Sequence, residues 1–148
     1  MSRVPLTEAI EHYLREIYKL GQEGDEPVSV TALARAQRVS PASASAMVKK
    51  LAALGLAEHQ PYRGVSLTPA GERVALEVIR HHRLLELYLA ETLGVDVEDV
   101  HDEADRLEHA ISEELEARID KALGFPTHDP HGDPIPDANL RWPHAASG

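Results

Sequence analysis

The chain has 148 residues, of which 43% are hydrophobic and 27% charged, a composition typical of one globular domain or two small ones. It contains no cysteine, which excludes disulfides, thiolate catalysis and cysteine-based zinc sites, so any metal site must use imidazole and carboxylate groups. No apolar run is long enough to span a membrane and the sequence MSRVPLTEAIEH contains no signal-peptide core, so we expect a cytoplasmic protein.

The net charge of −10 is distributed unevenly along the chain. Residues 28–70 contain five basic residues and one acidic residue, whereas residues 71–148 contain seven basic and 18 acidic residues. A basic module is therefore joined to an acidic one, and the total charge does not exclude a nucleic-acid partner.

The N-terminal part begins with two predicted helices. Thr7 is expected to cap the first, whose apolar residues recur every three to four positions until it ends near residues 21–24. Thr31 is expected to cap the second, a short helix with the sequence TALARAQR.

A third helix and a hairpin follow. Ser40 provides an N-cap and Pro41 a first-turn proline for a helix that runs to Gly55. Two helices joined by a tight turn, the second polar on one side, are typical of a helix-turn-helix. Short strands are expected at Leu56–His59 and Val65–Leu67 around the turn QPYRG, which predicts a winged helix.

Three more helices are predicted in the acidic half. Thr68 precedes a proline and caps a helix that extends to about Leu93, and its segment LLELYLA is apolar nearly all round, so it should be buried, for example between subunits. Further helices are expected from near Asp96 and from Ser112, the last one closed by Gly124.

The predicted fold class is mostly α, with a winged helix-turn-helix followed by an all-helical domain. We expect residues 1–70 to form the DNA-binding domain and residues 71–124 the helical domain. Residues 125–148 contain five prolines, so this tail should be extended or irregular.

The second helix of a helix-turn-helix lies in the major groove, and here its exposed face carries small side chains that allow the backbone to approach DNA closely. Lys49 and Lys50, together with Arg63 at the wing tip, suit phosphate contacts. The candidate DNA-binding residues are Ser40, Pro41, Ala42, Ser43, Ser45, Ala46, Lys49, Lys50 and Arg63. The alternative interpretation is a protein-docking wing with solvated lysines.

Residues 100–111, VHDEADRLEHAI, gather polar side chains along one side of a predicted helix. His101, Asp105, Glu108 and His109 fall within an arc of about 100°, beside an apolar stripe that does the packing. Spacings of three and four residues allow them to reach one ion. A second set comes from the preceding helix, where His82 and Glu86 are four residues apart. The alternative is a solvated acidic face.

Six stretches between about Thr7 and Pro136 resemble one known family, the metal-dependent repressors that include the diphtheria toxin repressor and the manganese transport regulator. They are EHYLREIYKL, the helix-turn-helix through LAALGL, YRGVSLTPAG, RHHRLLELYL, GVDVEDVHDEADRLEH and PHGDPIP. The resemblance implies a winged-helix domain and a helical dimerisation domain that bind operator DNA when loaded with Fe²⁺ or Mn²⁺. It also implies the two-domain form, which lacks the SH3-like domain of longer members.

The resemblance further implies two metal sites. The main site would consist of His12, Asp105, Glu108 and His109, and an ancillary site of His82, Glu86 and His101. Iron-type members have methionine and cysteine where this chain has His12 and Asp105, so the oxygen and nitrogen donors favour manganese. Manganese-type members have carboxylates at both positions and a glutamate where Arg15 stands. The remaining histidines are expected to face solvent (His81, His128, His131 and His144) or to belong to the wing scaffold (His59).

These observations predict a homodimeric, metal-activated transcriptional regulator rather than an enzyme. Its cofactor would be Mn²⁺ or alternatively Fe²⁺, with Zn²⁺, Co²⁺ or Cd²⁺ as substitutes, and its partner double-stranded operator DNA, with no membrane or small-molecule substrate. The ion would tie His12 to the acidic helix and so fix the spacing of the two recognition helices. Two alternatives stay open, a metal-independent winged-helix regulator and a metallohydrolase.

Overall fold

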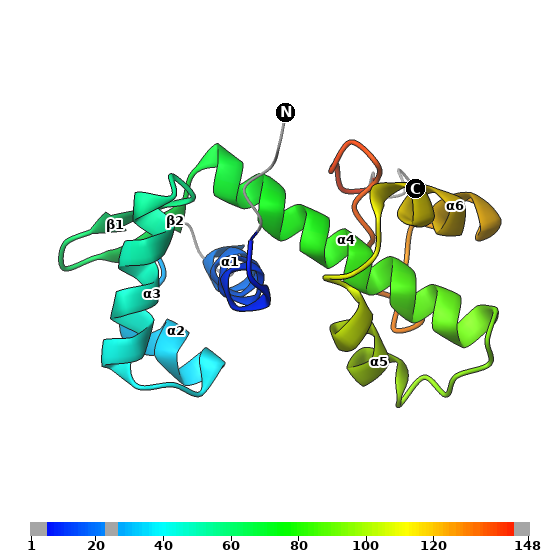
Figure 1. Ribbon diagram of the computed structural model, residues 1–148, viewed down its shortest axis with the longest axis horizontal. Helices are drawn as coiled ribbons and strands as arrows, with labels where there is room; N and C mark the ends of the chain where they lie inside the picture. Colours follow the sequence, from blue (N-terminus) through cyan, green and yellow to red (C-terminus); the bar gives the residue numbers. More distant parts are fainter. Residues whose placement is uncertain (1–5, 23–26, 144–148) are drawn as a thin grey trace, which may run out of the picture. The chain divides into compact units, whose positions relative to one another are not determined.

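A computed structural model describes residues 6–22 and 27–143 (Figure 1). Its elements in chain order are α1 (Glu8–Gln22), α2 (Val30–Gln37), α3 (Pro41–Ala53), β1 (Ala57–Gln60), β2 (Gly64–Leu67), α4 (Pro69–Glu91), α5 (Val100–Leu107) and α6 (Glu113–Ala122). Helices with one small hairpin confirm the predicted fold class. None of the helices in the described ranges is long and apolar enough to cross a membrane.

Contacts between Cα atoms divide the chain into two compact units. The N-terminal unit is Met1–Ala75 and the C-terminal unit is Leu76–Gly148, so the boundary falls inside α4. The division of function at residues 70 and 124 stays a prediction.

Helix α1 begins as predicted, because the Thr7 hydroxyl accepts a hydrogen bond of 3.2 Å from the N–H of Ile10. For α2 the predicted cap is wrong. Ser29, not Thr31, has the extended backbone of an N-cap and accepts a 3.0 Å hydrogen bond from the N–H of Ala32. The reason lies outside the helix: the preceding residue, Val28, is paired with Val65 in a β-bridge, so the chain is extended until Ser29 and turns helical directly after it.

Helix α3 has the predicted ends. Ser40 accepts a 3.1 Å hydrogen bond from the N–H of Ser43, Pro41 occupies the first helical position, and Gly55 follows with a φ of 76°. The chain then forms the antiparallel β1–β2 hairpin, in which Ala57 pairs with Leu67 and Gln60 with Gly64.

Gly64 is required where the wing meets the body of the N-terminal unit. It has a φ of +124°, and a Cβ there would lie 2.2 Å from the carbonyl oxygen of Val28. Only glycine allows the backbone bonds between Val28 and Val65, of 2.9 and 2.8 Å, to form at this point. Because Gly64 pairs with Gln60 beside the 61–63 turn, this contact holds the wing close to its tip.

A single hydrophobic cluster fills the N-terminal unit. It joins the apolar faces of α1, α2 and α3 to the hairpin and to the first turns of α4. Its buried members are Ile10, Tyr13, Leu14, Ile17, Val28, Leu33, Ala34, Ala44, Val48, Leu51, Leu56, Ala57, Val65 and Ala75. This core fixes α3 with its other face exposed.

In the C-terminal unit, the predicted burial of LLELYLA holds within one chain. Leu84 and Leu87 pack with Ile135, whereas Leu85 packs with Ala104 of α5 and Ile119 of α6. The segment after α6 is irregular as predicted, yet Ile135 is only 1% exposed, so this segment folds back onto α4. Guanidinium groups of Arg80 and Arg83 on α4 donate to the carbonyl oxygens of Pro136 and Pro134 at 2.9 and 2.6 Å.

The acidic helix is shorter than predicted. Residues 96–99 form a turn, with the N–H of Asp99 bonded to the Asp96 carbonyl at 2.8 Å, and α5 begins only at Val100. It ends at Leu107, so His109 lies in the turn after the helix and not on the helical arc expected for it. Ser112 caps α6 as predicted, accepting a 3.1 Å hydrogen bond from the N–H of Leu115.

Candidate metal centre and nucleic-acid surface

Helices α4 and α5 bring three predicted ligands of the ancillary site together. His82 and Glu86 lie on successive turns of α4, with Nε2 of His82 3.5 Å from Oε1 of Glu86. Nε2 of His82 is also 3.1 Å from Nδ1 of His101, which α5 contributes. One donor atom from each residue can be chosen such that all lie within 4.8 Å of one another. This spacing suits ligation of one cation.

The second ring nitrogen of His82 faces a different pair of carboxylates. Its Nδ1 contacts Oε2 of Glu108 and lies 3.4 Å from Oδ1 of Asp105, and these three residues form a second group of compatible donors. The side chain of Glu108 is completely buried. The ring of His82 therefore lies between two acidic groups, with Nε2 facing Glu86 and Nδ1 facing Glu108 and Asp105.

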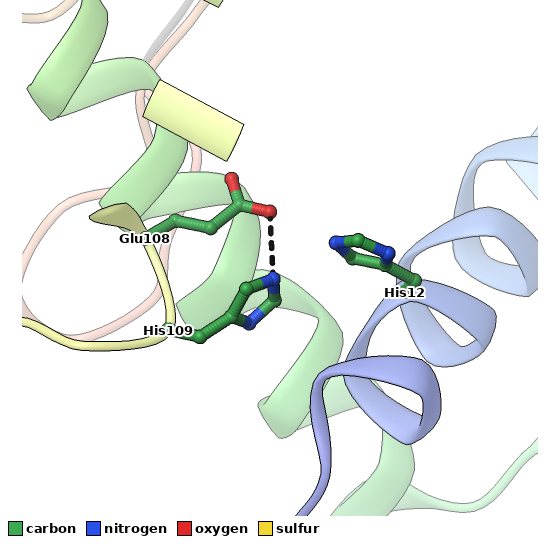
Figure 2. Close-up of side chains that lie close together, drawn as sticks. All are labelled: His12, Glu108 and His109. Atoms are coloured by element: carbon green, nitrogen blue, oxygen red, sulfur yellow. Dashed lines mark ion pairs between the residues drawn. The ribbon is translucent and has the colours of Figure 1, made fainter. Parts of the chain in front are cut away.

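Glu108 also contacts the predicted ligand that follows it. Nε2 of His109 is 3.1 Å from Oε1 of Glu108, as Figure 2 shows. His12, the third side chain drawn in Figure 2, extends from α1 of the N-terminal unit. Of the four predicted main-site ligands, Asp105, Glu108 and His109 thus belong to the end of α5, and His12 to a separate unit.

Burial and hydrogen bonds set the pKa values of this cluster. Burial lowers the pKa of His82, but hydrogen bonds to Glu108 and Glu86 outweigh it and raise the pKa from 6.5 to about 9. Burial likewise raises the pKa of Glu86, and the hydrogen bond to His82 outweighs it and lowers that pKa. The imidazolium of His82 thus supplies the positive charge that the buried carboxylates need.

Sequence reasoning missed a third group, formed by the segment that folds back onto α4. Nδ1 of His131 is 3.7 Å from Oε2 of Glu86 and 3.9 Å from Oδ2 of Asp129. Asp129 is 6% exposed, its Oδ1 accepts the N–H groups of His131 and Asp133, and its Oδ2 makes no hydrogen bond within the described chain. Burial, together with the charges of Asp133 and Glu86, raises the pKa of Asp129. Only the sequence DPHGD hinted at this group.

The donor chemistry of these groups fits a divalent cation. Oxygen and imidazole nitrogen without sulfur suit Mn²⁺, Fe²⁺ and Zn²⁺, and the share of carboxylates favours the harder of these ions. The buried Oδ2 of Asp129 is an acceptor without a donor, which is the kind of atom that a cation would satisfy. The residues present therefore fit a metal ion.

One histidine expected to face solvent does not. The side chain of His81 is 17% exposed, and its two ring nitrogens lie 2.6 Å from Oε2 of Glu116 and 3.2 Å from the carbonyl oxygen of Glu108. Burial lowers the pKa of His81, but the bond to Glu116 outweighs it and raises the pKa. His128 is exposed as expected and its Nδ1 lies 2.9 Å from the Thr127 hydroxyl, whereas His144 lies outside the described residues.

The predicted DNA-binding residues form the outer face of α3 and the wing tip. Ser45 is half-buried and the others are exposed. Their hydroxyls are partly engaged already, because Ser40 caps the helix and lies 3.0 Å from the Ser43 hydroxyl. The small side chains of this face, on Pro41, Ala42 and Ala46, project little from the helix. Two basic side chains, Lys49 and Lys50, follow near the C-terminal end of α3, so the shape and charge of this face suit a DNA groove.

Tyr62 at the wing tip is a further exposed residue that sequence reasoning did not single out. It is fully exposed, at 108% relative exposure, and has a φ of 65°. A bulky side chain in the left-handed region is strained, and strain of this kind gathers at functional sites.

Comparison with known proteins gives two family models that together match most of the chain. Residues 5–65 match the iron-dependent repressor N-terminal DNA-binding domain, and residues 68–137 match the iron-dependent repressor metal-binding and dimerisation domain. The chain is 39% identical over 131 residues to the diphtheria toxin repressor of Corynebacterium efficiens, covering 88% of this chain and 56% of that protein. It is 35% identical over 114 residues to an HTH-type transcriptional regulator of Methanocaldococcus jannaschii, covering 77% and 91%.

A solved structure is also similar. A manganese-dependent transcriptional repressor in complex with manganese superposes with a TM-score of 0.82 at 47% sequence identity, covering 93% of this chain and 63% of that one. The chain thus spans little more than half the length of the curated diphtheria toxin repressors that it matches, and about two thirds or less of this structure.

Proposed function

The chain belongs to the iron-dependent repressor family, as its resemblance to metal-dependent repressors indicates, and on that premise we propose that it is a metal-activated DNA-binding transcriptional regulator of manganese or iron homeostasis. It acts in the cytoplasm as a homodimer on palindromic operators. The observation that carries this proposal is the cluster of carboxylates and imidazoles that α4, α5 and the turn after α5 contribute, in a chain whose α3 has a basic outer face of small side chains.

The main metal site consists of His12, Asp105, Glu108 and His109. The ancillary site consists of His82, Glu86 and His101, and Asp129 and His131 offer Glu86 a second set of partners. A bound divalent cation supplies the positive charge that the buried carboxylates otherwise draw from protonated histidine. Glu108, which is completely buried between His82 and His109, is the residue least able to remain charged without such a partner.

Manganese is the favoured effector. The set contains aspartate at position 105 and histidine at position 12, and neither offers the sulfur that softer ions prefer. Iron is the alternative, and Zn²⁺, Co²⁺ and Cd²⁺ are substitutes. Similar proteins are named for both metals, as the iron-dependent repressor IdeR and the manganese-dependent repressor illustrate.

On DNA, α3 enters the major groove and the wing contacts the backbone beside it. Ser40, Ser43 and Ala46 approach the base edges, while Lys49 and Lys50 bind phosphates. Arg63 and Tyr62 extend the wing toward the flanking backbone. The two recognition helices of a dimer must engage half-sites about 34 Å apart, or a multiple of this distance. An ion bound by His12 of one unit and by ligands of the other would fix this spacing and so raise DNA affinity. Linkage then requires that operator DNA raise metal affinity by the same factor.

A mobility-shift titration of the protein's own promoter DNA tests the proposal. We expect binding in Mn²⁺ or Fe²⁺ and its loss in chelator. Glu108→Ala should abolish metal-stimulated binding, whereas Glu114→Ala, a matched change at an exposed position of α6, should leave it unchanged. Operator binding that ignores the chelator would instead indicate a metal-independent winged-helix regulator, and wild-type stimulation of Glu108→Ala would refute the metal site.

A further inference from the structure

The turn that carries two proposed ligands begins at the end of a helix. Glu108 is the C-cap of α5, and its N–H is bonded to the carbonyl oxygen of Ala104 at 2.8 Å. Carbonyl groups at the end of a helix have no partner within the helix and need one from outside it. The carbonyl of Glu108 belongs to the planar peptide unit that joins Glu108 to His109, so the direction of this one group affects both ligands.

His81 of α4 supplies a partner from outside the helix. Its Nδ1 lies 3.2 Å from the carbonyl oxygen of Glu108, within hydrogen-bond distance. A histidine that donates to the last carbonyl of a neighbouring helix also meets the negative end of that helix's dipole. The end of α5 is therefore capped by a side chain from α4.

Glu116 of α6 fixes the ring of His81 from its other side. Oε2 of Glu116 is 2.6 Å from Nε2 of His81, and Oε1 is 2.5 Å from Nε of Arg80. One carboxylate thus holds two consecutive side chains of α4, one through each oxygen. Both partners of His81 are acceptors, so the ring can turn only by giving up a hydrogen bond to a buried group.

Arg80 keeps Glu116 in place. The guanidinium is 4% exposed and also bonds Oδ2 of Asp120 at 3.0 Å and the carbonyl oxygen of Pro136 at 2.9 Å. The carboxylate of Glu116 is therefore anchored independently of the metal ligands. A chain of hydrogen bonds runs from the C-terminal segment and α6, through Arg80, Glu116 and His81, to the peptide between the two ligands.

From these contacts we infer that Glu116 and His81 are a positioning pair for the metal centre. They orient the Glu108–His109 peptide and thereby aim the Glu108 carboxylate and the His109 imidazole at a common ion. The inference rests on the proposed metal site and adds two residues that bind no metal themselves. Groups that orient ligands in this way typically change metal affinity about 10- to 100-fold when they are removed.

Isothermal titration of the full chain with Mn²⁺ tests the pair. Glu116→Gln keeps the shape of the side chain and one acceptor for Arg80, but it places an amide donor against the ring N–H of His81. His81→Leu removes both donors of the ring. We expect each variant to bind Mn²⁺ about 10- to 100-fold more weakly than the wild type. The double variant should bind Mn²⁺ no more weakly than the single variant with the lower affinity, because both changes break one chain of contacts.

The matched control is Glu114→Gln, the same chemical change on the same helix at a side chain that is 77% exposed and pairs only locally with Arg118 at 3.2 Å. It should bind Mn²⁺ as the wild type does. The absorption spectrum of bound Co²⁺ supplies a second readout, since a general loss of stability would leave the spectrum of the bound ion unchanged. We expect it to change in Glu116→Gln and His81→Leu and to be retained in the control.

Wild-type Mn²⁺ affinity in Glu116→Gln would overturn the positioning pair, and so would losses that add up in the double variant. If Glu116→Gln does not fold, His81→Leu decides, since wild-type affinity in that variant would overturn the pair equally. Failure of the wild-type chain to bind Mn²⁺ would overturn the metal site itself. If the wild type binds Mn²⁺, Glu108→Ala does not, and Glu116→Gln binds as the wild type does, only the positioning pair is overturned.

Discussion

The two units of the chain bury different chemistry. In the N-terminal unit, one continuous hydrophobic cluster joins α1, α2, α3 and the wing. In the C-terminal unit, the apolar clusters are small, and charged or titratable groups are buried beside them. All the buried polar and charged residues of the described chain lie in this second unit: Arg80, His82, Glu86, Glu108, Asp120 and Asp129.

This contrast indicates that the stabilities of the two units respond differently to pH and to metal ions. Burial of apolar surface depends little on pH or ions, so we expect the stability of the N-terminal unit to change little with either. Buried carboxylates need a positive partner, and whether a proton or a cation supplies it depends on the solution. The C-terminal unit is therefore the one whose stability responds to the surroundings. The single tryptophan, Trp142, lies in that unit within 5.8 Å of Arg83 and reports on it by fluorescence.

The largest effect is expected from breaking the apolar core. Leu33 of α2 is fully buried, and Leu33→Ala should lower the free energy of unfolding of the N-terminal unit by about 2–5 kcal/mol through lost burial and the resulting cavity. Urea denaturation followed by far-UV circular dichroism measures the change. The loss should be the same with Mn²⁺ or chelator and at each pH, and a loss that Mn²⁺ repairs would contradict the contrast between the units.

A pH effect of similar size is expected in the other unit when chelator is present. The raised pKa of His82 means that its contribution to stability is fully present below pH 6.5 and is lost as pH rises through about 9. This pKa shift corresponds to about 3 kcal/mol of unfolding free energy. Solvent screening reduces the value little, because the side chain is only 9% exposed. Unfolding monitored by Trp142 fluorescence at several pH values measures the loss.

His82→Gln should remove most of this pH dependence. The control is His59→Gln, which changes an exposed histidine of β1 in the N-terminal unit and should leave the profile as it is. A profile that stays steep in His82→Gln would show that another group carries the dependence.

A cation should take over the role of the proton. At a free Mn²⁺ concentration 100 times the dissociation constant, the unfolding free energy detected by Trp142 should rise by about 2.7 kcal/mol. Glu108→Gln removes the buried negative charge and should abolish the rise, whereas Glu114→Gln should keep it. Stabilisation of Glu108→Gln to the wild-type extent would place the ion elsewhere. Because His82 must release its proton to bind, the affinity for Mn²⁺ should also increase with pH up to about 9.

Local chemistry made most of the fold predictable. Thr7, Ser40, Thr68 and Ser112 each cap the helix that the sequence assigns to them, because capping needs only a side-chain oxygen and an N–H a few residues ahead. The cap of α2 was assigned wrongly because a distant residue, Val65, decides where the chain stops being extended. Spacing along α4 likewise sufficed to group His82 with Glu86, whereas it was the family resemblance that added His101 from α5 to this set.

The missed parts of the site depend on contacts between residues far apart in sequence. His81 faces Glu116, 35 residues later, and no helical period links them. Asp129 and His131 reach Glu86 only because Ile135 is buried beside Leu84 and Leu87 and draws the proline-rich segment onto α4. Sequence patterns describe one element at a time, so a ligand set completed by a returning segment is outside their reach.

The smallest expected effect compares one chemical change in both units. Ser40 and Ser112 cap α3 and α6 with the same geometry, each accepting a backbone N–H at 3.1 Å. Ser→Ala at either position should lower the unfolding free energy by about 1 kcal/mol, measured by urea denaturation. The two variants should differ in their affinity for Mn²⁺. Ser112 fixes the first turn of α6, which carries Glu116, so Ser112→Ala should weaken Mn²⁺ binding several-fold, whereas Ser40→Ala should not change it. Equal Mn²⁺ affinities in the two variants, at equal losses of stability, would mean that the start of α6 has no influence on the metal ligands.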